Sequence, residues 1–542
     1  MTRFVLLVVC VLLTTGVGTA RAFAQEHRGD RKLDAALRVR AHAIPTAPRH
    51  STSSRIIIRT VDGLPVTALV TAVGGTVGRF FATLGAQVAD VPDASLDWLA
   101  SQPEIDALSL DRAVRDTMQR TATSIGALWV GGQLGVSGTG VGVATIDSGV
   151  SPTHPDLDGR VLHFADFVGR QVSPYDDYGH GTHVAGIVAG SGRASNGARR
   201  GVAPGAHLVV LKALDQRGVG FTSNVIAAIE YAIEHRRAFN IRVINLSVAA
   251  SVYESYLTDP LTVAARRAVD AGIVVVAAAG NRGRTAAGNA VYGGIASPGN
   301  APWVLTVGAI SENGTTSRND DAVAEFSSRG PSALDLEVKP DVVAPGVAIE
   351  STTEPSSALF NSHPGSRLWG AQASAHEPYL SLTGTSMSAP VVSGVVALMI
   401  EANPRLTPNA VKAIVQYTAE TRAGVDYLTQ GAGFLNARGA VELSRTLADS
   451  KASSEPLDEP LRWGRHVIWG NRRIGGRLLD ADPRAWALGV TWGAKTGPDG
   501  EPIEWAACDD GGCEPVAAPP VAACQGGDDC RPAAPAREGK RQ

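Results

Sequence analysis

Val141-Gly142-Val143-Ala144-Thr145-Ile146-Asp147-Ser148-Gly149 is the stretch that sets the expected fold of this chain. The run from Val141 to Ile146 is short and apolar, which predicts a buried strand of a parallel sheet. Asp147 follows at once, so it is expected at the carboxyl end of that strand. Open α/β sheets bind their ligands at this edge.

Outward from this stretch, apolar runs of strand length alternate with longer runs of helical length. The predicted strands are 141–146, 207–213, 242–248, 272–279, 303–309 and 341–344, and the predicted helices are 180–190, 222–236, 260–271, 386–402 and 407–419. Such alternation is typical of a mostly parallel sheet flanked by helices on both faces. The expected fold class is therefore a three-layer α/β domain.

Two further segments offer the partners of a nucleophilic hydrolase. His180 opens His180-Gly181-Thr182-His183, and Ser386 lies within Gly384-Thr385-Ser386-Met387-Ser388-Ala389-Pro390. A serine hydroxyl needs a nearby base, and the base needs an orienting group, so Asp147, His180 and Ser386 form a candidate triad. Pro390 is tolerated near a helix start, which places Ser386 at a helix N-terminus whose N–H groups favour negative charge.

Each of these residues also has an ordinary structural interpretation. Asp147 or Ser386 alone would be a cap or turn residue, and Asn281-Arg282-Gly283 alone would be a turn. Their occurrence together favours catalysis. His183 is interpreted as a packed histidine, because an H-x-x-H pair lacks the glutamate of a zinc-binding H-E-x-x-H motif.

The three segments resemble the subtilisin-like serine proteases (subtilases), and the resemblance covers roughly residues 125–445. It is also carried by Gly201-Val202-Ala203-Pro204, Val243-Ile244-Asn245-Leu246-Ser247, Ala277-Ala278-Ala279-Gly280-Asn281, Phe326-Ser327-Ser328-Arg329-Gly330-Pro331, Lys339-Pro340-Asp341 with Val342 to Gly346, and Gly431 to Ala437. It implies a subtilisin-like fold preceded by a small α+β pro-peptide domain. It also implies that Asn281 donates to the oxyanion together with the Ser386 N–H.

The resemblance further implies a cleft in which an extended peptide adds as a strand. The implied substrate-binding residues are Gly218, Val219, Gly220, Ser247, Val248, Ala249, Ala278 and Gly280. Two departures stand out. Val248-Ala249-Ala250 replaces the usual Leu-Gly-Gly stretch, and Ser388 stands where alanine is common. They bear on specificity and structure rather than on proton transfer.

The first 24 residues read as a signal peptide. Arg3 supplies a positive start, residues 4–13 an apolar core, and Ala20-Arg21-Ala22 or Ala22-Phe23-Ala24 a small-residue cleavage signal. The apolar run is too short for a confident membrane span, and Cys10 is discarded with it. The mature protein is expected to be secreted, with no membrane contact after signal removal. The net charge of −3 offers no electrostatic case for nucleic-acid binding.

The remaining organisation is expected as follows: a flexible lead at 25–54, an inhibitory pro-peptide at 55–120, the catalytic domain at 121–446 and a C-terminal extension at 447–542. Strands at 55–59 and 105–110 and a helix at 94–101 support the pro-peptide, although an unrelated N-terminal domain stays open. The maturation cut is expected within 116–123. Residues 347–380 are expected to be a long loop before the nucleophile that shapes or covers the cleft.

The extension contains two tryptophan pairs of equal spacing, Trp463 with Trp469 and Trp486 with Trp492, followed by Trp505. Packing onto the catalytic domain is favoured, and a binding platform for a surface, polysaccharide or protein is the alternative. Cys508, Cys513, Cys524 and Cys530 suggest disulfides, with local pairing favoured over zinc binding. Residues 515–542 are rich in proline and alanine, as in disordered segments.

The expected function is a secreted, self-processing serine endopeptidase acting on proteins or peptides, with its own pro-peptide as inhibitor. A catalytically silent binding protein and an esterase with the same triad stay open. No cofactor is expected to be required. Calcium stays open without an identified site, because Arg193, Arg199 and Arg200 oppose a cation in the loop 191–200.

Overall fold

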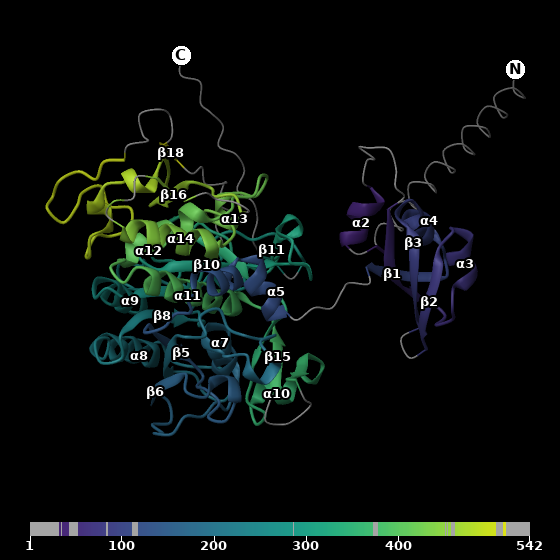
Figure 1. The fold of residues 1–542 in the computed structure, drawn as a ribbon, viewed down its shortest axis with the longest axis horizontal. Coiled ribbons are helices and arrows are strands. Elements are labelled where there is room, and N and C mark those ends of the chain that lie inside the picture. The colour runs from purple at the N-terminus through teal and green to yellow at the C-terminus, as the bar shows by residue number, and fades with distance from the viewer. Residues whose placement is uncertain are drawn as a thin grey trace, which may run out of the picture. The chain divides into compact units, whose positions relative to one another are not determined.

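The computed structural model describes residues 32–33, 35–42, 52–82, 85–110, 117–285, 287–371, 378–449, 451, 454–456, 461–505 and 513–515. The chain divides into two compact units, Met1–Val114 and Arg115–Gln542 (Figure 1). The signal peptide and Cys508, Cys524 and Cys530 lie outside the described residues.

The larger unit is built on a sheet in which β5 is an inner strand. Its strands are β5 (Gly142–Asp147), β6 (Val161–Asp166), β7 (His207–Lys212), β8 (Ile241–Leu246), β9 (Val274–Ala278), β10 (Leu305–Ser311), β11 (Ala322–Val323) and β12 (Val342–Pro345). The order is β11-β10-β9-β8-β5-β7-β6, with β12 paired to β10, and all of these pairings are parallel except β10 with β11. The six predicted strands are confirmed.

Helices cover both faces of this sheet. They are α5 (Thr117–Ser124), α6 (Ala127–Trp129), α7 (His180–Ala189), α8 (Thr222–Glu234), α9 (Pro260–Asp270), α11 (Thr385–Ala402), α12 (Pro408–Thr418), α13 (Tyr427–Gln430) and α14 (Ala437–Ala448). Alternate β5 residues point to opposite faces, so Val143 packs in the α7–α11 core, whereas Ala144 and Ile146 pack beneath α8 and α9. The predicted three-layer fold is confirmed.

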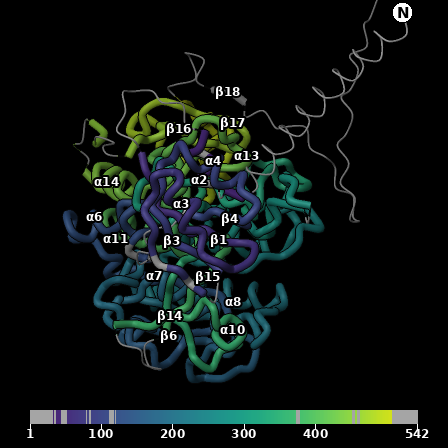
Figure 2. The backbone as a smooth tube through the Cα atoms, turned by 90° about the vertical axis from the view of Figure 1, so that its right-hand side faces the viewer, coloured from purple at the N-terminus to yellow at the C-terminus, as the bar shows by residue number. Residues whose placement is uncertain are grey.

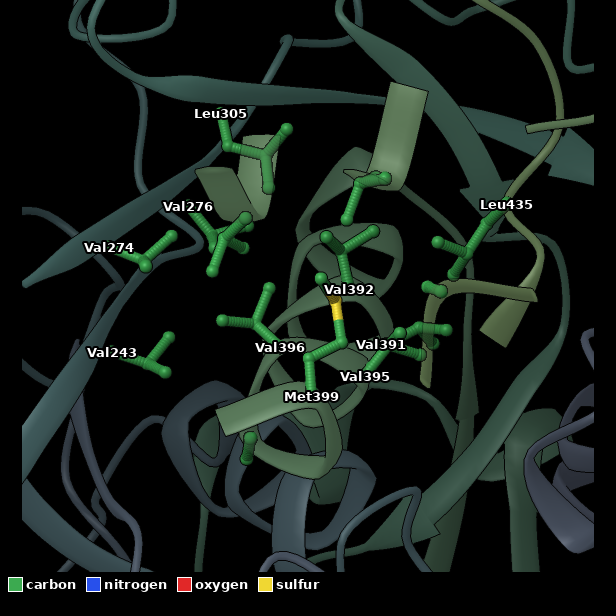
Figure 3. Close-up of a cluster of buried hydrophobic side chains, with 14 of the residues drawn as sticks. Val243, Val274, Val276, Leu305, Val391, Val392, Val395, Val396, Met399 and Leu435 are labelled. Atoms are coloured by element: carbon green, nitrogen blue, oxygen red, sulfur yellow. The ribbon is translucent and has the colours of Figure 1, made fainter. Parts of the chain in front are cut away.

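Helix α11 runs through the larger of the two cores. Figure 3 shows valines of α11 and Met399 facing Val243, Val274 and Val276 of β8 and β9, with Leu305 beside them. This helix is long and apolar enough to cross a membrane, but 83% of it is buried inside the protein, as in a core helix. Ser386 is therefore fixed at the end of a deeply packed element.

The strand order positions the predicted site. The chain runs from β5 to β6 and β7 on one side, then returns to β8 on the other side of β5. The order reverses next to β5, which is where such sheets bind ligands. Asp147 ends β5, Ser247 follows β8, and Asn281 follows β9, so three predicted residues share this edge.

The segment 347–380 is not the predicted long loop. It contains β13 (Ile349–Thr352), α10 (Ala358–Ser362), β14 (Arg367–Trp369) and β15 (Pro378–Leu382), with the strands forming an antiparallel sheet, and 372–377 lie outside the described residues. This small sheet packs on α7, because Ser351 Oγ donates to the carbonyl of His183 and Thr352 Oγ1 to that of Thr182. It supports the helix that carries His180.

The smaller unit is described by itself. It comprises α2 (Ala35–Ala41), β1 (Ser53–Thr60), α3 (Thr67–Ala72), β2 (Thr76–Phe81), β3 (Ala86–Pro92), α4 (Leu96–Ser101) and β4 (Ile105–Leu110). An antiparallel sheet of order β2-β3-β1-β4 packs on these helices, as expected for an α+β domain. The prediction of a flexible lead at 25–54 is wrong for residues 32–42, since Leu33 and Leu37 are buried in this core.

Helix α5 occupies most of the window predicted for the maturation cut. It is docked on Glu312, which is buried and accepts hydrogen bonds from Thr121 Oγ1 at 2.8 Å and from Ser124 Oγ, and pairs with Arg120. A protease needs an extended substrate, so a cut inside this window requires α5 to unwind or leave Glu312.

The C-terminal extension packs onto the catalytic region, which is the interpretation that the sequence analysis favoured. Trp463, Trp469 and Trp492 are at most 7% exposed, and β16 (His466–Trp469) pairs with β17 (Arg472–Gly475), which pairs with β18 (Cys513–Pro515). Figure 2 shows β16 and β17 on the side of this unit that carries α14. Because α14 crosses the predicted boundary at 446–447 and both parts form one unit, residues 461–505 are not a separate domain.

The two tryptophan pairs are not two copies of one structure. Of the second members, Trp469 ends a strand, whereas Trp492 lies in a turn. Of the first members, Trp463 lies outside any helix or strand, whereas Trp486 ends a short 3-10 helix, Pro483–Trp486. Trp469 contacts the rings of Trp486, Trp492 and Trp505 with centroid separations of 4.7 to 6.1 Å. Trp469, Trp486, Trp492 and Trp505 thus pack on one another, half-buried to buried, and do not form an exposed platform.

Candidate active site

Asp147 and His180 are brought together at the sheet edge. His180 Nδ1 lies 2.8 Å from Asp147 Oδ1, and the Ser148 N–H donates to the same oxygen at 2.8 Å. The Asp147 side chain is fully buried, while that of His180 keeps 15% of its surface exposed. The imidazole is therefore anchored at Nδ1, which leaves Nε2 as the nitrogen available for proton transfer.

A buried carboxylate that the sequence analysis missed fixes the start of α7. Asp176 accepts hydrogen bonds from the Gly179 N–H at 2.7 Å, from the Thr182 N–H at 2.7 Å and from Ser148 Oγ at 2.8 Å. It thus satisfies free donors at the N-terminus of the helix and ties them to the residue after Asp147. A carboxylate four residues before His180 was the available signal.

Two further contacts hold the same loop. Lys212 Nζ, fully buried, donates to the Ser148 carbonyl at 2.5 Å and to Asp177 at 2.6 Å. A Cβ on Gly181 would clash with the Gly149 carbonyl, so glycine allows α7 to approach the strand end. The separation of His180 from Asp147 depends on both.

Burial and the nearby charges act in opposite directions on the pKa of His180. Burial alone would lower the pKa, but the charge of Asp147, its hydrogen bond and the charge of Asp176 together raise the pKa above the ordinary 6.5. Burial lowers the pKa of His183 to about 3, and its Nε2 faces the carbonyls of Ile349 and Leu380. His183 is a neutral packing residue, as predicted.

Ser386 is the second residue of α11. Its Oγ donates to the Ser247 carbonyl at 3.0 Å and is not hydrogen-bonded to His180 within the described part of the chain. Ser247 Oγ donates in return to the Ser386 carbonyl at 2.7 Å. That carbonyl is available because Pro390, four residues later, has no N–H to donate to it.

Behind this exchange lies a buried polar chain. Asn245 Nδ2 donates to Ser247 Oγ at 3.0 Å, and Ser393 Oγ of α11 donates to Asn245 Oδ1 at 2.8 Å. The carboxyl end of β8 is therefore fixed to α11 at two positions, Ser386 and Ser393. Sequence spacing offered no signal for this chain of contacts.

Asn281 is oriented by the residue before Ser386. Its Oδ1 accepts hydrogen bonds from the N–H and the hydroxyl of Thr385, both at 3.0 Å. The amide nitrogen therefore faces away from these donors, and it lies beside Gly384, where an added Cβ would be 3.4 Å from Nδ2. Asn281 Nδ2 and the unbonded N–H of Ser386 both lie at the start of α11.

The predicted substrate-binding residues fall into two groups. Gly218 has a positive φ of 71° and lies against the ring of Tyr178, whose centroid is 6.3 Å from that of His180. Val219 is 58% exposed. Across the edge, Ser247 contacts Ser386, and Ala249 is exposed.

Ala278 and Gly280 differ from the expectation that they contact substrate. Ala278 is buried in the core. The N–H of Gly280 donates to Thr385 Oγ1 at 3.1 Å, and its carbonyl accepts from the Ser328 N–H at 2.9 Å. Because their groups are already used inside the protein, these two residues support Asn281 rather than offer a binding surface.

The loop 191–200 is tied together by protein groups. Arg199 Nε lies 2.8 Å from Glu350, while Asp156 accepts from the Ala194 N–H at 2.8 Å and from Tyr379 Oη at 2.7 Å. A hard cation needs several free oxygen ligands, so these residues do not fit a calcium ion. The described part of the chain holds no group of three or more histidine, cysteine, aspartate or glutamate residues suited to a metal.

The match to a family model spans residues 138–440 and is described as the subtilase family. This chain belongs to the subtilase family. The subtilase is 42% identical over 311 residues to "Serine protease AprX" of Bacillus subtilis (strain 168), which covers 56% of this chain and 67% of the relative. It is 32% identical over 372 residues to "Subtilisin E" of the same strain, covering 68% and 84%.

A solved structure of "a cold adapted subtilisin-like serine proteinase" is also similar to the subtilase. The sequence identity is 27%, the match covers 56% of this chain and 88% of the other, and the TM-score is 0.41. By its family and relatives, the subtilase is a subtilisin-like serine endopeptidase.

The buried hydroxyl of Ser388 leads to a prediction about the stability of the subtilase. Its hydroxyl is buried and has no hydrogen-bond partner among the described residues. An unsatisfied buried polar group costs roughly 1–3 kcal/mol, so Ser388→Ala is expected to raise the free energy of unfolding by about 1 kcal/mol. Ser393→Ala on the same helix removes a bonded hydroxyl and is expected to lower it by a similar amount. Thermal unfolding in a Ser386→Ala background, which avoids self-digestion, measures both; a destabilised Ser388→Ala protein would contradict the assignment.

Proposed function

We propose that this subtilase is a secreted, self-processing serine endopeptidase in which Ser386 is the nucleophile. His180 is the general base, Asp147 orients it, and Asn281 with the Ser386 N–H binds the oxyanion. The observation that carries the proposal is the 2.8 Å Asp147–His180 pair, located at the same sheet edge as the N-terminus of α11. A nucleophile, an oriented base and oxyanion donors are the parts that acyl transfer requires.

The reaction begins with a rotation of the Ser386 hydroxyl. Its proton leaves the Ser247 carbonyl and turns to His180 Nε2, since catalytic hydrogen bonds often form only with substrate bound. Ser386 Oγ attacks the scissile carbonyl carbon while His180 takes the proton, and the oxygen becomes an oxyanion. His180 then gives that proton to the leaving amine, and water repeats the sequence to release the acid.

The substrate is proposed to be an extended peptide. One side of the peptide lies along 218–220 and the other along 247–249, where main-chain groups follow the ends of β7 and β8. Recognition through main-chain hydrogen bonds tolerates many sequences, which suits a protease of broad specificity.

The N-terminal unit is proposed to be the inhibitory pro-peptide, following a signal peptide at 1–24. The compact α+β core of β1–β4 supports a separately folding domain. The cut is proposed within 116–123, with α5 unwound during cleavage and docked on Glu312 afterwards. N-terminal sequencing and intact mass of the secreted protein test both cuts; a mature protein retaining residues 53–110 would contradict this assignment.

Labelling with a serine-directed fluorophosphonate tests the function. The mature protein is expected to be labelled at Ser386 and to hydrolyse casein in preference to short acyl esters. Absence of labelling would favour a catalytically silent binding protein, and a preference for esters would favour an esterase. Ser386→Ala and heat-denatured protein are the negative controls.

The raised pKa of His180 leads to a prediction about how the activity depends on pH. The base must be neutral to accept a proton, so kcat/KM is expected to rise through a midpoint above pH 6.5, the ordinary imidazole value. Asp176→Asn removes a charge that raises this pKa and is expected to move the midpoint to lower pH, whereas exposed Asp158→Asn is expected to leave it in place. A pH profile of peptide hydrolysis measures both, and a midpoint below 6.5 would contradict the arrangement.

A further inference from the structure

Three backbone segments form a frame beside Ser386. Ala250 and Ser297 exchange backbone hydrogen bonds of 2.9 and 3.0 Å, which join the segment 247–251 to the segment 295–297. The Ala296 N–H donates to the Ala279 carbonyl at 3.0 Å, which joins 295–297 to 279–282. The segments 247–251 and 279–282 are the two sides of this frame, and 295–297 is its base. Ser247 on one side and Gly280 on the other contact α11.

Arg282 connects the two sides at their outer ends. Its backbone N–H donates to Ser328 Oγ at 3.0 Å, and one guanidinium nitrogen donates to Ser251 Oγ at 2.9 Å. The side residues of the frame are small, including Ala249, Ala250 and Gly280. Arg282 is therefore the long, charged group of this frame.

The charge of Arg282 is not compensated. Its side-chain partner is a neutral hydroxyl, the residue is exposed, and no ion pair to a described carboxylate involves it. By contrast, Arg284 two residues later is paired with Glu325. The carboxylate of Asp259 lies behind the base of the frame, where it accepts from Ser297 Oγ at 2.6 Å and from the Leu261 N–H at the start of α9.

The proposed function determines which part of a substrate meets this frame. The scissile carbonyl oxygen points to Asn281 Nδ2, and the residue that contributes this carbonyl runs alongside 247–249. The side chain of that residue must then project between 248–251 and 280–282. Its outer end meets the Arg282 guanidinium, a planar group whose donors match a carboxylate.

We propose that Arg282 makes the enzyme prefer peptides with aspartate or glutamate immediately before the scissile bond. This inference rests on the proposed function and adds the substrate class. The guanidinium, whose charge is not compensated, attracts a carboxylate and repels an ammonium group. The same charge therefore favours acidic residues and disfavours lysine at this position. Because the site is open to solvent, salt should weaken the preference.

Three peptides that differ only in the residue before the scissile bond, Glu, Gln or Lys, test the proposal. Glu and Gln have the same shape, so their ratio isolates the charge. The wild-type enzyme is expected to show a kcat/KM ratio for Glu over Lys of about 10 at low salt, as for a partly exposed charge pair. The ratio should fall as ionic strength rises.

Arg282→Gln is expected to bring the Glu-to-Lys ratio close to one, and Arg282→Glu to invert it. Arg284→Gln is the matched control, and it should leave the ratio unchanged because that charge is already paired. A ratio that Arg282→Gln does not alter would overturn the specificity while leaving the proposed function intact. Hydrolysis of none of the three peptides, together with no fluorophosphonate labelling, would overturn the proposed function and the specificity with it.

Discussion

Ser386→Ala is expected to lower kcat/KM for peptide hydrolysis by about 10⁶. The remaining groups of the site keep their positions, but the bond-forming oxygen is gone. The variant loses the hydrogen bond from Ser386 Oγ to the Ser247 carbonyl, while Ser247 Oγ still donates to the carbonyl of residue 386. The variant should therefore stay folded and accumulate as an unprocessed precursor.

The measurement is a continuous peptide assay together with intact mass, using protein from a protease-free host. Ser388→Ala is the matched control, because it removes a hydroxyl two residues away that has no partner among the described residues. It should retain hydrolysis and processing. An active, fully processed Ser386→Ala protein would contradict the assignment of the nucleophile.

Asp147→Asn is expected to lower kcat/KM by about 10⁴ with little change of shape. The carboxylate of Asp147 accepts a hydrogen bond from the Nδ1–H of His180 at 2.8 Å, which leaves Nε2 free to act as a base. An amide at 147 has no charge and no longer stabilises the imidazolium, and in the orientation that turns its NH₂ to Nδ1 the neutral ring carries its proton on Nε2. His180 then has no lone pair facing Ser386.

Fluorophosphonate labelling of Ser386 should slow in parallel with hydrolysis, since both reactions need the activated hydroxyl. Asp158→Asn, an equal change at an exposed carboxylate, is the control and should keep wild-type rates. A rate within tenfold of wild type for Asp147→Asn, in a protein with unchanged thermal unfolding, would contradict the role of this carboxylate.

The sheet was predictable because most of its strands are buried on both faces and so read as continuous apolar runs. The two strands that were not predicted, β6 and β11, are the exceptions: Phe164 is the one buried residue of β6, and β11 has none. The lead was misread for a related reason. Leu33 and Leu37 are two apolar residues among charges, and their burial depends on contact with β4 and α4 rather than on a local pattern.

The candidate site divides in the same way. Asp147, His180, Asn281 and Ser386 carry their chemistry in their residue types and lie in local motifs. The Lys212–Ser148 contact and the Ser247–Ser386 exchange have no such signature, because the partners are 64 and 139 residues apart in the chain. Asp176 had only its place four residues before His180 as a signal. The equal tryptophan spacing was compatible with exposure or burial; the contacts of Trp463 with Tyr417 and of Trp492 with Lys412, both on α12, decided for burial.

The amino-acid sequence by itself determined the α/β layer order, the subtilase motifs and the choice of candidate catalytic residues. These depend on side-chain type and on periodicity along one element. The tertiary structure decided which nitrogen of His180 is anchored, where the Ser386 hydroxyl rests, which cleft residues are already engaged and that the tryptophans are internal. These depend on hydrogen bonds and burial between distant segments, because a polar group or an aromatic ring takes its role from the partner that reaches it in space.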